Sequence, residues 1–179
     1  MSTSASFWTR YQSPLKIYEG LTLAPLPTGT NADQKSLNNG DINTQNQLSD
    51  AYQQHPEPIR SKDKGNSFDF HIYHLPSNAD EKKYAQELHE RIRREFPEMR
   101  IYRFWDRPVG PHPIPMFEIN TFTPSETGAL FGFLTIWRGP LSVLIHPNTD
   151  DEFKDHTELC SWMGRPVPLD TSFLKHGPH

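Results

Sequence analysis

Three segments after residue 67 carry side chains that could bind a metal ion. His71, Glu118 and His146 each lie where apolar and polar residues alternate. Such alternation is typical of a β-strand with two different faces, so the polar residues of each segment should share one face. Two imidazoles and a carboxylate leave one side of the ion vacant, an arrangement that suits ferrous iron and oxygen chemistry.

Two further histidines accompany these segments. His112 lies in the Pro-rich segment Gly110–Pro113, and His156 follows Asp155. Idealised geometry places His112 at the far end of the sheet from His146, so we expect it to face the substrate as an acid or base, with metal ligation as its alternative role. Asp155 and His156 follow the last of these segments and could add to the same site.

Each candidate also has a structural interpretation. His71 could be a hydrogen-bonded sheet histidine, and Glu118 could be a solvent-facing strand residue. His112 could belong to a turn, and Asp155 with His156 could form the cap and first turn of a helix. A shared metal site is better supported than any single ligand, because the alternation in each of three strands separately places a polar residue on the same face.

The elements that must position these residues alternate between strands and helices. Ser77 and Asp80 give a start signal for one helix, and Pro97 ends it. Thr123, Pro124 and Glu126 cap a second helix. A short third helix is expected near Asp155, carrying Leu159, Cys160, Trp162 and Met163. The expected strands are residues 68–73, 100–105, 115–122 and 141–146.

The resulting order, βαββαβ, predicts an α+β ferredoxin-like sandwich with one open sheet face. In that fold the strands lie in the order 4-1-3-2, and both helices cover one face. The apolar residues of the strands should therefore face the helices, leaving His71, Glu118 and His146 on the open face. Adjacent strands lie about 4.8 Å apart, so these three side chains could reach one ion.

Composition limits the remaining possibilities. Residues 1–66 are largely polar after Thr28, and we expect a mostly disordered or strap-like extension before a domain at 67–170 and a tail at 171–179. The net charge of −4 argues against nucleic-acid binding. A single cysteine, Cys160, excludes a disulfide framework and favours a reducing compartment, the cytoplasm. No long apolar run is present, so we expect no membrane span.

The motifs of the domain resemble those of the DOPA 4,5-dioxygenase family. They are Phe68-Asp69-x-His71-x-Tyr73, Gly110-Pro111-His112-Pro113 with Met116 and Glu118, Leu141-Ser142-Val143-Leu144-x-His146-Pro147, and Asp155-His156 followed by Trp162-Met163-Gly164 and Pro168-Leu169. The resemblance covers residues 68–170 and leaves out the polar N-terminus. Asp69 stands where some members of the family carry another histidine, and no ligand is assigned there.

The resemblance implies an extradiol dioxygenase, an oxidoreductase that uses non-haem Fe(II) and O2 to cleave the aromatic ring of a catechol such as DOPA. His71, Glu118 and His146 would then hold the iron, and His112 would transfer protons. His156 would be a second acid or base, or a group that Asp155 orients next to the metal ligands. Tyr73 could bond a substrate oxygen. A substrate carboxylate could meet Arg103, Arg107 or Arg165, although all three could equally be surface residues.

Two rival interpretations remain open. A non-catalytic ferredoxin-like binding or oligomerisation module would use the same histidines structurally. A zinc hydrolase could use the same side chains, but the chain lacks an H-E-x-x-H motif. An open sheet face or a free strand edge could also pair with a second copy, giving a homodimer.

Overall fold

The computed structural model describes residues 13–39 and 48–177. The chain divides into two compact units, residues 1–47 and 48–179. The described part of the first unit contains a short 3-10 helix, η2 (Lys16–Tyr18), and a turn closed by pairing of Thr30 with Leu37. Part of the predicted N-terminal strap, residues 7–11, lies outside the described residues. The domain limits expected from the sequence stay a prediction.

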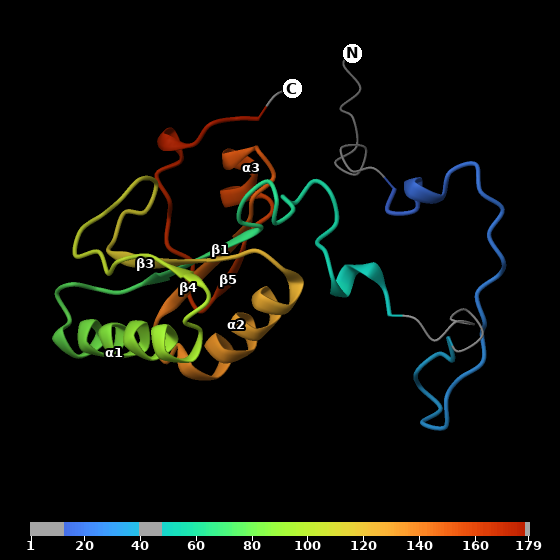
Figure 1. Cartoon of the computed structure of the whole chain (residues 1–179), viewed down its shortest axis with the longest axis horizontal. Coiled ribbons are helices and arrows are strands. Elements are labelled where there is room, and N and C mark those ends of the chain that lie inside the picture. Colours follow the sequence, from blue (N-terminus) through green and yellow to red (C-terminus); the bar gives the residue numbers. More distant parts are fainter. Residues whose placement is uncertain (1–12, 40–47, 178–179) are drawn as a thin grey trace, which may run out of the picture. The chain divides into compact units, whose positions relative to one another are not determined.

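The second unit is built on one antiparallel sheet (Figure 1). Its strands are β1 (Phe68–Tyr73), β2 (Arg100–Ile101), β3 (Met116–Thr121), β4 (Ser142–Pro147) and β5 (Ser161–Met163). They lie in the order β2-β3-β1-β4-β5. The ferredoxin-like order predicted from the sequence is confirmed, and β5 extends it beside β4.

Two long helices begin at the predicted caps or close to them. The first, α1 (Ala79–Glu95), is capped by Asn78, whose side chain accepts a hydrogen bond from Glu81 N. The second, α2 (Pro124–Trp137), is capped as predicted by Thr123, which accepts from Glu126 N. Figure 1 shows both helices on one side of the sheet, with the short helix α3 (Glu152–Thr157) on the other.

The apolar faces of the strands meet α1 and α2, as strand alternation predicts. The main core joins strand residues to one stripe from each helix. Its fully buried members are Phe70, Ile72, Ala85, Ile92, Phe117, Ile119, Leu130, Leu134 and Val143. A smaller cluster on the opposite face centres on Tyr73, Met116 and Leu144. Loop residues Trp105 and Ile114 pack on it, with Val167 and Leu169 from the C-terminal segment. Part of the face without α1 and α2 is therefore covered by coil.

Two predicted elements differ from the structure. The third helix does not include residues 159–163, because α3 ends at Thr157 and Ser161–Met163 form β5. Trp162 packs in the smaller cluster and Met163 against the main core, and adjacent residues reach opposite faces only in an extended chain.

The second predicted strand is also shorter than expected. Only Arg100 and Ile101 pair as strand β2, although Tyr102 N donates to Glu118 O and Trp105 N to Met116 O. Three steps along this segment therefore match two along β3. The one extra residue interrupts regular pairing.

Among the described residues, no helix has both the length and the apolar character that crossing a membrane requires.

Candidate metal centre

Strand β1 presents Asp69, His71 and Tyr73 on the face opposite α1 and α2. In the register of the sheet, His71 lies opposite Glu118 of β3, and Asp69 lies opposite His146 of β4. Side chains at these positions alternate with the core residues Phe70 and Ile72, so they share one face. The register therefore places His71, Glu118 and His146 on one face of the sheet, as strand alternation predicts.

His71 and His146 form the centre of this face. Their Nε2 atoms are 3.0 Å apart, and both side chains are almost fully buried. Two nitrogens bound to one ion at about 2.1 Å, at a right angle, are separated by about 3 Å. His146 Nδ1 lies 2.8 Å from the backbone oxygen of Pro147, which can only accept a hydrogen bond. Nδ1 therefore carries the proton, and the Nε2 lone pair is directed at His71.

Asp69 supplies a carboxylate beside the two imidazoles. Its Oδ1 accepts hydrogen bonds of 2.5 Å from the side-chain amides of Asn66 and Asn120. Its Oδ2 lies 3.9 Å from His146 Nε2, within the roughly 4.2 Å that two ligand atoms bound at about 2.1 Å can span. Asp69, His71 and His146 offer ligand atoms that all lie within 4.8 Å of one another. Sequence reasoning assigned no ligand to Asp69, although its position two residues before His71 places both on the same strand face.

Glu118, the carboxylate expected from the sequence, lies one strand over. Its Oε1 accepts a 2.6 Å hydrogen bond from the Asn120 amide, which also donates to Asp69. Glu118 belongs to neither group of converging ligand atoms among the described residues. Burial and the neighbouring Asp69 carboxylate raise the pKa of Glu118 to about 7.

The loop that carries His112 folds back over the sheet. The His112 ring centre is 4.2 Å from that of His71, and His112 Nδ1 is 2.6 Å from the Tyr73 hydroxyl. A tight turn closes this loop, because Val109 and His112 exchange backbone hydrogen bonds. Asp170 N also donates to Pro111 O, which ties the loop to the C-terminal segment. The loop therefore brings His112 next to His71, whereas idealised strand geometry placed His112 at the far end of the sheet from His146.

His156 completes the histidine cluster from helix α3. Its ring centre is 3.9 Å from that of His146, and its Nδ1 is 2.8 Å from Glu152 O, one helical turn earlier. The Asp155 carboxylate accepts hydrogen bonds from Thr149 N and Oγ1, and so holds the turn between β4 and α3. His156 Nδ1 thus donates its orienting hydrogen bond to a backbone carbonyl oxygen and not to Asp155. His71, His112 and His156 form a second group of ligand atoms within 4.8 Å.

Electrostatics keeps all four imidazoles neutral. Burial lowers the pKa of His71 well below its usual value, and the neighbouring histidines lower it further. Burial is also the main cause of the lowered pKa of His112, to about 3, and of His146 and His156, to about 4. Neutral imidazoles keep the lone pairs that a cation requires. The donor set of nitrogen and carboxylate oxygen fits a divalent transition metal.

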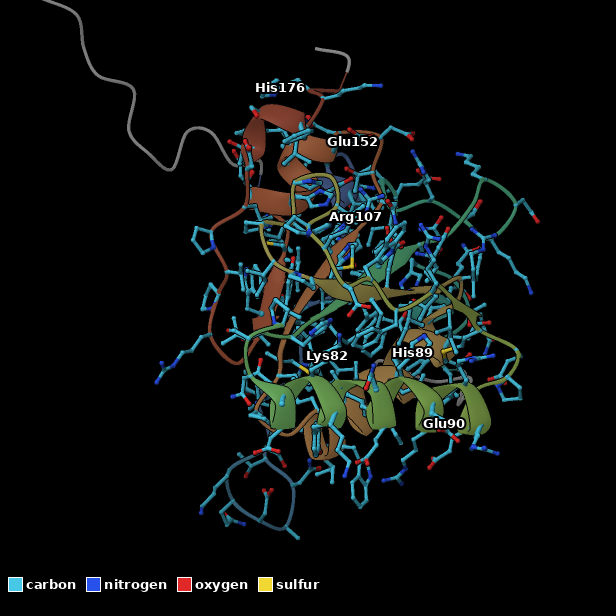
Figure 2. The ribbon with its side chains drawn as sticks, turned by 90° about the vertical axis from the view of Figure 1, so that its left-hand side faces the viewer. Lys82, His89, Glu90, Arg107, Glu152 and His176 are labelled. Carbon is cyan, nitrogen blue, oxygen red and sulfur yellow. The ribbon has the colours of Figure 1, made fainter. Side chains whose placement is uncertain are left out.

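The three predicted substrate-binding arginines lie in two places. Arg103 stacks on Trp105 at 3.8 Å, and Arg107 lies 5.8 Å from the same ring. Arg107 is on the side of the sheet opposite α1, as Glu152 of α3 is (Figure 2). Arg165 instead lines a cavity of about 450 Å³ that also contacts Tyr73. Arg165 thus shares a cavity lining with Tyr73, whose hydroxyl contacts His112.

Comparisons with known proteins identify the family of the chain. Residues 68–173 match the model of the Dopa 4,5-dioxygenase family. The chain is 51% identical over 172 residues to a protein from Botryotinia fuckeliana named "Uncharacterized 21.2 kDa protein", covering 92% of this chain and 91% of that protein. It is 40% identical over 111 residues to the DOPA 4,5-dioxygenase of Amanita muscaria, covering 59% of this chain and 48% of that enzyme.

A solved structure also resembles this chain. The crystal structure of a candidate dioxygenase from Nostoc punctiforme superposes with a TM-score of 0.56 at 28% identity, covering 65% of this chain and 91% of that one. These findings support an enzyme of the dioxygenase class. The chain belongs to the Dopa 4,5-dioxygenase family.

Proposed function

We propose that this protein is a non-haem Fe(II)-dependent extradiol dioxygenase that cleaves the ring of a catechol with O2. The observation that supports this most directly is the group of Asp69, His71 and His146. Two imidazoles and one carboxylate with open positions are the ligand set of non-haem Fe(II) oxygenases. The name of the Amanita relative, DOPA 4,5-dioxygenase, supports a catechol as the substrate class.

The proposed ligands are His71 and His146 through Nε2, with one carboxylate. Asp69 is the nearer carboxylate, because two amides hold its Oδ1 and leave Oδ2 beside His146. Glu118, proposed as a ligand from the sequence, would have to replace Asp69 by a side-chain rotation, giving up its bond to Asn120. Iron bound there would supply Lewis acidity to the two catechol oxygens and a path for electrons to O2.

The other residues of the site would bind and orient the substrate and transfer protons. His112 and His156 flank His71, with ring centres 6.0 Å apart, and one of them must take a proton from the catechol. Trp162 stacks on Tyr73, with ring centres 5.6 Å apart, and Tyr73 in turn contacts His112. Arg165 would bind a substrate carboxylate from the adjoining cavity. Arg103 and Arg107 are the alternatives for that role.

The test is iron-dependent oxygen uptake. Protein purified without oxygen and loaded with Fe(II) should consume O2 and give a coloured ring-fission product with at least one member of a catechol panel. His71→Ala and His146→Ala should abolish both signals while keeping the melting temperature within a few degrees. His176→Ala, a change at an exposed histidine of the C-terminal segment, is the matched control and should keep full activity. Oxygen uptake that survives both site mutations would refute the proposed iron site.

A further inference from the structure

The hydrogen bond between Tyr73 and His112 determines where His112 carries its proton. Tyr73 is 1% exposed, and its 2.6 Å contact with His112 Nδ1 is the one hydrogen bond its hydroxyl makes among the described residues. If His112 donated from Nδ1, the Tyr73 hydroxyl proton would be buried without an acceptor in this part of the chain. A buried donor without an acceptor bears its full desolvation cost. The hydroxyl therefore donates to Nδ1, and the proton of the neutral imidazole lies on Nε2.

The His112 ring is held from two sides, by the Tyr73 hydroxyl at Nδ1 and by its own loop. The loop fixes the other side of the ring, because Asp170 N holds Pro111 O and the turn at Val109 holds His112 N. His112 is 4% exposed, and its ring lies 4.2 Å from that of His71. Its Nε2–H is therefore held beside the proposed metal ligands.

His156 is arranged in the opposite sense. Its Nδ1 lies 2.8 Å from Glu152 O. A carbonyl oxygen has no proton to give, so Nδ1–H donates and Nε2 keeps its lone pair. His156 is half-buried, and its ring centre lies 6.2 Å from that of His71 and 6.0 Å from that of His112. One cluster thus contains an imidazole with a donor Nε2 and an imidazole with an acceptor Nε2.

We infer that the hydrogen bonds made by Tyr73 and by the Glu152 carbonyl fix different tautomers, and therefore different roles, for the two histidines. His112 donates a hydrogen bond to the substrate, and His156 accepts a proton from it. This assignment rests on the proposed function for its substrate. A proton leaves a catechol hydroxyl oxygen and bonds to Nε2 of His156, which becomes imidazolium. His112 keeps its proton and directs Nε2–H at the oxygen on which negative charge develops. His112 is then not a metal ligand, because Nε2 has no free lone pair. Tyr73 is a positioning residue that acts through His112.

The tautomers can be observed without any turnover. Long-range proton–nitrogen correlation spectra of the full chain with isotope-labelled histidine, metal-free and with Zn(II), separate the two neutral forms. His112→Gln and His156→Gln assign the signals. We expect the His112 proton on Nε2 and the His156 proton on Nδ1. In Tyr73→Phe the His112 signal should shift toward the other form, and in Tyr102→Phe, the same change at a partly exposed ring, it should stay. A His112 proton on Nδ1 in the unaltered protein overturns the inference.

Metal affinity and turnover give two further readouts. Zn(II) affinity should stay within about twofold of the unaltered protein in Tyr73→Phe and His112→Gln, whereas a loss of tenfold or more would make His112 a ligand. With Fe(II) and a catechol that the unaltered protein cleaves, Tyr73→Phe should lower kcat by about tenfold or more and leave KM within about threefold. An unchanged kcat contradicts the positioning role. If no catechol is cleaved at all, the proposed function fails, and the spectra still decide the tautomers.

Discussion

Acidification should destabilise the metal-free protein steeply. His71, His112 and His146 are at most 4% exposed, and burial lowers the pKa of each in the folded state, for His112 to about 3 and for His146 to about 4. The unfolded chain has ordinary histidines with pKa near 6.5. Below that pH the unfolded state binds more protons than the folded state, so stability falls as pH falls. Above it both states are neutral, and these three groups leave stability unchanged.

Glu118 opposes this trend. Its folded pKa is raised to about 7, so between that value and its unfolded pKa near 4.5 the folded state binds the extra proton. Its contribution therefore grows as pH falls through that window. Each group changes the free energy of unfolding by at most about 1.4 kcal/mol per pH unit, so the three histidines less Glu118 contribute about 2.7 kcal/mol per pH unit near pH 5.5. The lowered pKa of His156 adds to this slope, and the raised pKa of Asp69 subtracts from it. This slope would remove much of a typical stability of about 5–15 kcal/mol by pH 4.

Urea denaturation followed by tryptophan fluorescence, at half-unit steps from pH 7.5 to pH 5, measures this slope. His146→Gln should reduce it by about 1.4 kcal/mol per pH unit. His176→Gln, at an exposed site, should leave it unchanged. A free energy of unfolding that is flat between pH 6.5 and pH 5, or that rises as pH falls, would refute the burial of neutral imidazoles as the basis of the site.

Other expected outcomes concern the ligands, the substrate and the fold. Asp69→Asn should lower the Zn(II) affinity, measured by calorimetry, at least tenfold and by more than Glu118→Gln does. A larger loss of affinity in Glu118→Gln would make Glu118 the ligand. Arg165→Ala should raise KM for a carboxylated catechol about tenfold and leave KM for plain catechol unchanged, whereas Arg103→Ala should change neither. An equal effect on both substrates would contradict carboxylate binding. Thr123→Ala should lower the free energy of unfolding by about 1 kcal/mol, measured in urea, because α2 loses its cap; Thr123→Ser should restore most of it.

Strand alternation and helix caps predicted the fold, and alternation predicted which strand residues share the sheet face opposite α1 and α2. The rule that apolar neighbours face the helices placed His71 and His146 on one side, and the structure brings their Nε2 atoms to 3.0 Å. The same rule covers Asp69, two residues before His71. Its omission followed from comparison with relatives that carry histidine there, although the Asp69 side chain lies directly opposite His146 in the register.

Contacts between segments far apart in the sequence determine two features that local patterns did not predict, the position of the His112 loop and strand β5. The His112 loop folds back because Asp170 N binds Pro111 O and because Val167 and Leu169 pack beside Ile114. No local pattern predicts which distant segment covers a loop. Strand β5 shows the same limit, since its residues resemble a continued helix until pairing of Trp162 with Leu144 is considered.

Anomalous diffraction from crystals of the Fe(II)-loaded protein, measured on both sides of the iron edge, would locate the iron and identify its ligands. We expect one iron peak at about 2.1 Å from Nε2 of both His71 and His146, with a carboxylate oxygen of Asp69 in the same coordination sphere. An iron peak bound by only one of these two histidines, or at another place in the chain, would contradict the proposed iron site.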